Sequence, residues 1–68
     1  MNRMRDWLIA KRKAQGMTQR EFASLLGIPV STLAAYEQAA RTPTVARAKA
    51  LAKKLNVAWE QFFDPNHQ

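Results

Sequence analysis

Glycine and proline are rare in this chain, and their positions divide it into segments of helix length. The 68 residues contain only two glycines and three prolines. Gly16 and Gly27 close the first two segments, Pro43 follows the third, and an Asp-Pro pair near the C-terminus ends the last. Because no segment alternates apolar and polar residues as a half-buried strand does, the sequence predicts an all-α fold. We expect a single domain over residues 1–68, built from five helices that short turns connect.

Apolar residues recur at helical spacing in each segment and predict which side of each helix is buried. With their capping residues included, the helices are expected at residues 3–15, 18–27, 29–38, 44–55 and 58–63. The side chains expected to form the core are Met4, Trp7, Leu8, Phe22, Ala23, Leu25, Leu26, Leu33, Tyr36, Val45, Ala48, Leu51, Ala52, Leu55, Val57, Trp59, Phe62 and Phe63. We expect the tail, residues 64–68, to be frayed.

Helix starts and stops are marked by residues with known capping preferences. Thr18 and Glu21 form the T-x-x-E capping box, in which each side chain accepts a hydrogen bond from the main-chain N–H of the other residue. Thr44 is expected to cap the fourth helix, and Asn56 to end it in the left-handed conformation.

The charge of the chain points to a polyanionic partner. Eleven lysine and arginine residues against five acidic residues give a net charge of +6. Such an excess suits nucleic acid or an anionic membrane surface. The basic residues do not form one face of a helix opposite a bulky apolar face, so we expect DNA and no membrane.

Several function classes lack the residues that they need. There is no cysteine and one histidine, His67, so we expect no metal centre, and we expect no cofactor or small-molecule ligand. The acidic residues are scattered, and no activated nucleophile or glycine-rich phosphate loop is present, so we expect no enzyme activity. The sequence has no signal peptide pattern and no apolar run of membrane-spanning length, so we expect a cytoplasmic protein associated with the nucleoid.

Residues 18–38 have the spacing of two crossing helices joined by a tight turn. Ala23 precedes Gly27 by four residues, Leu33 follows it by six, and Tyr36 comes three later. A small residue at 23 lets the helices cross closely, and the glycine permits a positive φ in the turn. Leu33 and Tyr36 then hold the second helix over the first. The spacing predicts a helix-turn-helix unit, whose second helix can lie in the DNA major groove.

The segment TQREFASLLGIPVSTLAAYE, residues 18–37, resembles the Cro/phage-repressor (Xre-type) family of DNA-binding proteins. RKAQGMTQ before it, RTPT after it and NVAWEQFF near the end fit the same family, so the resemblance covers residues 4–63. It implies a compact five-helix domain of the phage-repressor type. It also implies a double-stranded DNA operator as the partner, bound sequence-specifically and often by a homodimer on a palindromic site.

The resemblance also implies which positions contact DNA and which hold the fold. An ion pair between Arg12 and Glu37 would tie the first helix to the end of the third. The positions that match DNA contacts of the family are Thr18, Gln19, Val30, Ser31, Thr32, Ala35, Gln38, Arg41 and Thr42.

The chain departs from the family pattern in two places. Relatives usually have Asn-Gly followed by a basic residue after the third helix, where this chain has Gln38-Ala39-Ala40-Arg41 and so lacks the glycine that tolerates a positive φ. At the base-contacting positions, Val30 and Ala35 can touch a thymine methyl group but cannot form the bidentate bonds of Arg, Asn or Gln. Two functions therefore stay open. One is a stand-alone Cro-like repressor that acts by occupying its operator, and the other is a protein-interaction module such as an antitoxin or anti-repressor.

Overall fold

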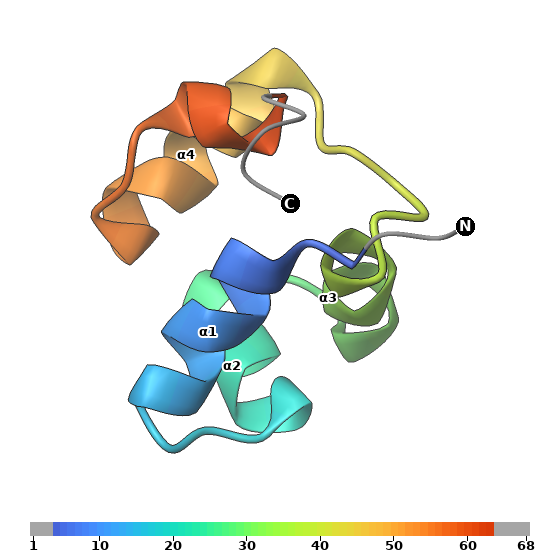
Figure 1. Cartoon of the computed structure of the whole chain (residues 1–68), viewed down its shortest axis with the longest axis vertical. Helices are drawn as coiled ribbons and strands as arrows, with labels where there is room; N and C mark the ends of the chain where they lie inside the picture. Colours follow the sequence, from blue (N-terminus) through green and yellow to red (C-terminus); the bar gives the residue numbers. More distant parts are fainter. Residues whose placement is uncertain (1–3, 64–68) are drawn as a thin grey trace.

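The computed structural model describes residues 4–63 and arranges them as four α-helices and a short 3₁₀ helix (Figure 1). The expected frayed tail, with His67, lies outside the described residues. The elements in chain order are α1 (Asp6–Ala14), α2 (Gln19–Leu26), α3 (Val30–Glu37), α4 (Val45–Leu55) and the 3₁₀ helix η1 (Trp59–Phe62). The described part contains no strand, so the all-α prediction is confirmed.

The prediction of a fifth α-helix is wrong, because the last element is a single 3₁₀ turn. Asn56 ends α4 with a φ of 58°, and Ala58 is extended, with a ψ of 132°. Hydrogen bonds from Gln61 N to Ala58 O and from Phe63 N to Glu60 O then follow the i to i+3 pattern of a 3₁₀ helix.

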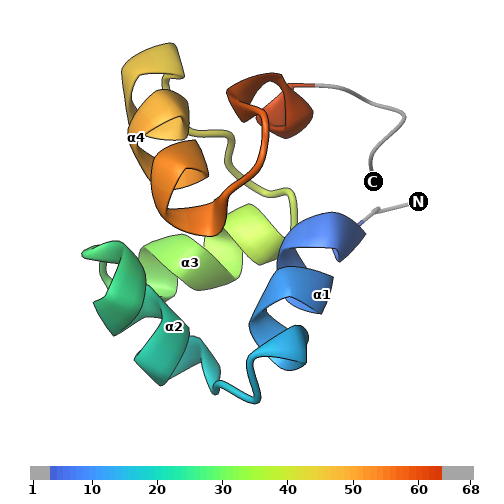
Figure 2. The ribbon, with the colours of Figure 1, turned by 90° about the vertical axis from the view of Figure 1, so that its left-hand side faces the viewer.

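The first helix starts later than residue 3, which corrects another expectation. Its N-cap is Arg5, at a φ of −82° and a ψ of 79°. The Arg5 N–H donates to the main-chain oxygen of Glu37 at 2.7 Å. This hydrogen bond joins the start of α1 to the end of α3. In Figures 1 and 2 the start of α1 lies beside the C-terminal end of α3.

The local capping signals behave as the sequence predicts. The Thr18 hydroxyl accepts from Glu21 N at 3.2 Å, and Thr18 N donates to Glu21 Oε1 at 2.9 Å. Gly27 ends α2 with a φ of 71°. The Thr44 hydroxyl accepts from the third main-chain N–H of α4, at Arg47. The caps fix both ends of α2 and the start of α4.

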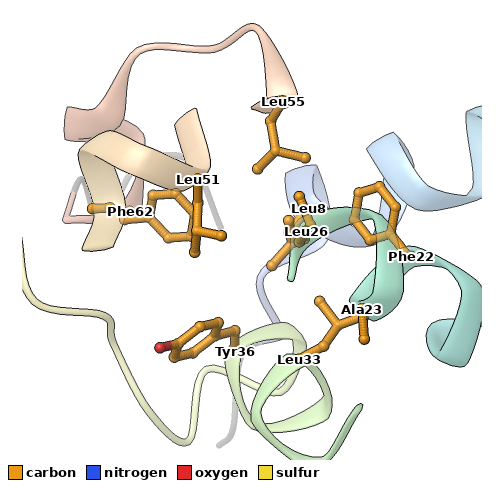
Figure 3. Close-up of a cluster of buried hydrophobic side chains, with 10 residues drawn as sticks. Leu8, Phe22, Ala23, Leu26, Leu33, Tyr36, Leu51, Leu55 and Phe62 are labelled. Atoms are coloured by element: carbon orange, nitrogen blue, oxygen red, sulfur yellow. The ribbon is translucent and has the colours of Figure 1, made fainter. Parts of the chain in front are cut away.

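The core lies between α4 and η1 on one side and α1, α2 and α3 on the other. Figure 2 shows α3 in the middle, with α4 on one side of it and α2 on the other. In Figure 3, side chains from all five elements point into one space. The most buried hydrophobic side chains are Leu8, Phe22, Ala23, Leu26, Leu33, Tyr36, Ala48, Leu51, Ala52, Leu55 and Phe62. The ring of Phe62 meets Trp7 edge-on, with centroids 4.9 Å apart.

Four side chains expected in the core, those of Met4, Leu25, Val45 and Phe63, are 43% to 47% exposed. They lie at the edges or ends of elements, although the Phe63 ring still meets the half-buried Trp59 edge-on, with ring centroids 5.9 Å apart. Leu25 is one residue, about 100° of helix rotation, away from the buried Leu26. Val45 is the first residue of α4, and Met4 and Phe63 flank α1 and η1. No helix in residues 4–63 is long and apolar enough to cross a membrane.

Candidate nucleic-acid interface

The α2–α3 pair has the geometry that its spacing predicts. Ala23 is 2% exposed and Leu33 is fully buried, so the two helices meet through a small residue and a branched one. Gly27 supplies the left-handed turn between them, and Tyr36 is buried one turn after Leu33. These contacts hold α3 against α2 and leave Val30 and Ser31, in the first turn of α3, exposed.

The first turn of α3 is the most accessible part of this helix. Val30 and Ser31 are exposed, whereas Thr32 and Ala35 are half-buried. Pro29 is the N-cap residue, and its side chain makes no capping bond. The first turn therefore presents one aliphatic side chain and two hydroxyls to an incoming partner.

The loop after α3 forms a tight turn without a glycine. Ala39 takes a φ of 59°, which is the left-handed conformation in which relatives usually have glycine. The N–H groups of Ala40 and Arg41 both donate to Ala35 O, at 3.0 and 3.3 Å. Ala39 thus carries the strain of a β-carbon in the left-handed region, and the loop keeps its turn.

A hollow of about 430 Å³ lies between α3, this loop and the start of α4. We call it the basic hollow, because two arginines and no acidic residue line it. Three of the residues at positions that match DNA contacts of the family line this hollow together, namely Thr32, Arg41 and Thr42. The complete lining is Pro29, Thr32, Tyr36, Arg41, Thr42, Pro43, Thr44 and Arg47.

Arg47 is a member of the basic hollow that the sequence did not single out. Helical periodicity places it only on the side of α4 away from the core. The Arg47 side chain is exposed and lines the hollow with Arg41. Its position depends on how α4 crosses α3, and no local pattern carries that information.

The structure contains the ion pair expected between Arg12 and Glu37. Arg12 Nε donates to Glu37 Oε2 at 2.7 Å, and Arg12 Nη2 donates to Glu37 Oε1 at 3.3 Å. A further bond from Arg12 Nη1 to Met17 O, at 3.1 Å, ties the turn before α2 to the same guanidinium group. The pair joins α1, the α1–α2 turn and the end of α3.

Gln19 is part of this network as well as a predicted DNA contact. Its Nε2 donates to Glu37 Oε1 at 2.9 Å, and its side chain is half-buried. An amide has a second N–H and a carbonyl oxygen, so this bond leaves hydrogen-bonding capacity for a ligand. The bond also brings the start of α2 next to the end of α3, where the exposed Gln38 lies.

Arg5 is the second functional candidate that sequence reasoning missed. The side chain is 2% exposed, and its guanidinium group donates to Tyr36 O, Arg41 O and the Thr42 hydroxyl. Burial lowers the pKa of Arg5 below its usual value, and the nearby Tyr36 raises it in part. These partners lie more than thirty residues away, so no sequence spacing signals them.

The fold and the α2–α3 geometry define a helix-turn-helix domain. A helix-turn-helix family model matches residues 8–62, and the chain belongs to this family of Cro/C1-type DNA-binding domains. No curated protein and no solved structure gave a significant match.

Proposed function

We propose that this protein is a sequence-specific, double-stranded DNA-binding transcription regulator, and that it is a Cro-like repressor acting by operator occupancy. The observation that carries the proposal is that the accessible first turn of α3 and the basic hollow are continuous. Thr32 belongs both to the accessible first turn of α3 and to the basic hollow. A helix whose first turn enters the major groove would thereby bring two arginines to the flanking phosphates.

Backbone contacts are proposed on both sides of α3. Arg41 and Thr42 lie at the basic hollow, with Gln38 at the start of the same loop. Thr18 and Gln19 lie at the start of α2, where the helix dipole and free N–H groups favour a phosphate. The bond from Gln19 to Glu37 supports this arrangement, because it holds the start of α2 beside the end of α3.

Base contacts are proposed for Val30, Ser31, Thr32 and Ala35. Ser31 and Thr32 can donate to or accept from several bases, so they position the helix more than they discriminate. Val30 can fill the space beside a thymine methyl group, and Ala35 leaves room for the base edge. We propose that the shape and deformability of the operator supply the rest of the specificity.

The proposal is tested by selecting bound sequences from a random duplex pool with the whole chain. We expect one motif to be enriched, and a palindromic motif would also establish binding as a homodimer. Binding to the enriched duplex, measured by fluorescence anisotropy, should exceed binding to a shuffled duplex of the same composition. Equal affinity for the two duplexes would contradict sequence-specific regulation.

A protein-interaction module is the second candidate. The four base-facing positions carry no amide or guanidinium group, and the Gln19 amide is partly engaged with Glu37. This surface is accordingly poor in the groups that read bases directly. The absence of any salt-dependent binding to duplex DNA would favour this candidate over the regulator.

A further inference from the structure

Arg5 connects four parts of the domain through one buried guanidinium group. Its Nη1 donates to Tyr36 O at 2.6 Å, at the end of α3. The Arg5 Cζ atom lies 5.7 Å from the centre of the Phe62 ring, which belongs to η1. Arg5 itself precedes α1 directly. A cation at this place stabilises the C-terminus of α3, where main-chain oxygens lack partners within the helix.

The same group also holds two consecutive residues of the loop between α3 and α4. Nη1 donates to Arg41 O at 3.1 Å, and Nη2 donates to the Thr42 hydroxyl at 3.2 Å. Arg41 and Thr42 line the basic hollow. Arg5 therefore contacts the loop from the buried side, while the exposed Arg41 side chain is left for the partner.

The bond to Thr42 determines what its hydroxyl can offer to a ligand. A hydroxyl has one O–H donor and two acceptor lone pairs. When a guanidinium donates to the oxygen, the proton of the hydroxyl stays available and is polarised by the charge. A phosphate oxygen is an acceptor, so it can accept a hydrogen bond from the O–H of Thr42.

We propose that Arg5 is a positioning residue of the DNA interface, which fixes Arg41 and Thr42 for phosphate contact without touching DNA itself. The inference rests on the proposed DNA-binding function. It concerns sequence-independent contacts, so mixed-sequence duplex DNA at about 50 mM salt is a sufficient probe.

The first test replaces Arg5 by lysine in the whole chain. Arg5→Lys keeps the charge but loses the planar fork that reaches three acceptors at once. Folding is checked first by urea unfolding, and affinity is measured at a temperature where all the variants are folded. We expect Arg5→Lys to bind duplex DNA about tenfold more weakly, with a shallower salt dependence. Lys13→Arg, a charge-preserving change at an exposed site of α1, is the matched control and should bind like wild type.

A second pair of variants keeps the inference testable if Arg5→Lys does not fold. Thr42→Val removes the hydroxyl and leaves the Arg5 bonds to Tyr36 and Arg41 in place. Thr42→Ser keeps the hydroxyl. We expect Thr42→Val to weaken duplex binding and Thr42→Ser to bind like wild type. Where Arg5→Lys folds, the two losses in the double variant Arg5→Lys, Thr42→Val should be less than additive, because both changes break the same bond.

The outcomes separate this inference from the proposed function. If wild type binds duplex DNA but folded Arg5→Lys binds equally well, or Thr42→Val binds like wild type, Arg5 does not position the interface. If the two losses of affinity are fully additive, Arg5 does not act through Thr42, and the inference is wrong. If wild type does not bind duplex DNA, the proposed function is wrong, and the inference is overturned with it.

Discussion

Arg12 and Glu37 form a two-bond ion pair that joins α1 to the last turn of α3. The Glu37 side chain is 1% exposed and that of Arg12 is 15% exposed, so the carboxylate is buried and the guanidinium reaches the edge of the solvent. A third donor, Gln19 Nε2, meets the same carboxylate at 2.9 Å. Three segments of the domain therefore depend on one acidic group.

Replacing Glu37 should destabilise the protein strongly. Glu37→Ala strands the Arg12 guanidinium group and removes an acceptor from Gln19. Breaking a buried pair costs about 3–5 kcal/mol, and because Arg12 is partly solvated we expect about 2–4 kcal/mol here. The measurement is the free energy of unfolding in urea.

The control for this prediction is Glu60→Ala. Glu60 is an exposed acid of η1, and its removal should change the unfolding midpoint little. An unfolding midpoint of Glu37→Ala equal to that of wild type would mean that the ion pair contributes nothing to stability.

Replacing Ala39 by glycine should change the free energy of unfolding in the opposite direction. Its φ of 59° is costly for any residue with a β-carbon. Ala39→Gly should remove this strain and raise the free energy of unfolding by about 0.5–1 kcal/mol, after the larger chain entropy of glycine is subtracted. Thermal unfolding followed by circular dichroism measures the effect.

The neighbouring Ala40 provides the matched control, because its φ is not positive. Ala40→Gly adds the entropic cost of glycine without relieving strain, so it should destabilise the protein slightly. Equal effects of the two substitutions would show that the left-handed conformation of Ala39 is not strained.

The sequence predicts well the features that depend on neighbours in the chain. The Thr18–Glu21 capping box, the turn at Gly27 and the stop at Asn56 all involve residues within one helical turn. Each has a physical preference that does not depend on the rest of the fold. The resemblance to the family also predicts the Arg12–Glu37 pair, although its members lie 25 residues apart.

The features that depend on how helices cross could not be predicted. Arg5 finds acceptors 31 to 37 residues away, and Arg47 reaches the basic hollow only because α4 starts beside α3. The periodicity of α2 and α4 likewise places Leu25 and Val45 near the apolar side, but it does not say where the neighbouring helix ends. Exposure at these edges is set by tertiary packing.

Arg41 should contribute to DNA affinity without contributing to sequence preference. Arg41→Ala removes an exposed guanidinium from the basic hollow, so it should weaken binding to enriched and shuffled duplexes by the same factor. The slope of log affinity against log salt should become shallower by about 0.9, the value for one phosphate contact.

Two variants complete the test of Arg41. Arg47→Ala should reduce the slope by a similar amount if the whole basic hollow faces phosphates. Lys13→Ala removes the same charge from an exposed site of α1 and should leave the slope almost unchanged. Unchanged affinity of Arg41→Ala, with its circular dichroism spectrum intact, would place the phosphate contacts elsewhere.

Val30 should account for one thymine preference in the operator. It is 36% exposed in the first turn of α3, where its methyl groups can pack against the C5-methyl group of thymine. Replacing that thymine by uracil removes the methyl group and should cost wild type about 1 kcal/mol, which is below the 1–3 kcal/mol of a bidentate base contact. Thymines of an enriched half-site are replaced one at a time, and affinity is measured for wild type and Val30→Ala. Wild type should lose affinity at one position and Val30→Ala should lose less there. If both proteins give the same profile, or if no thymine is sensitive, α3 does not read DNA through Val30.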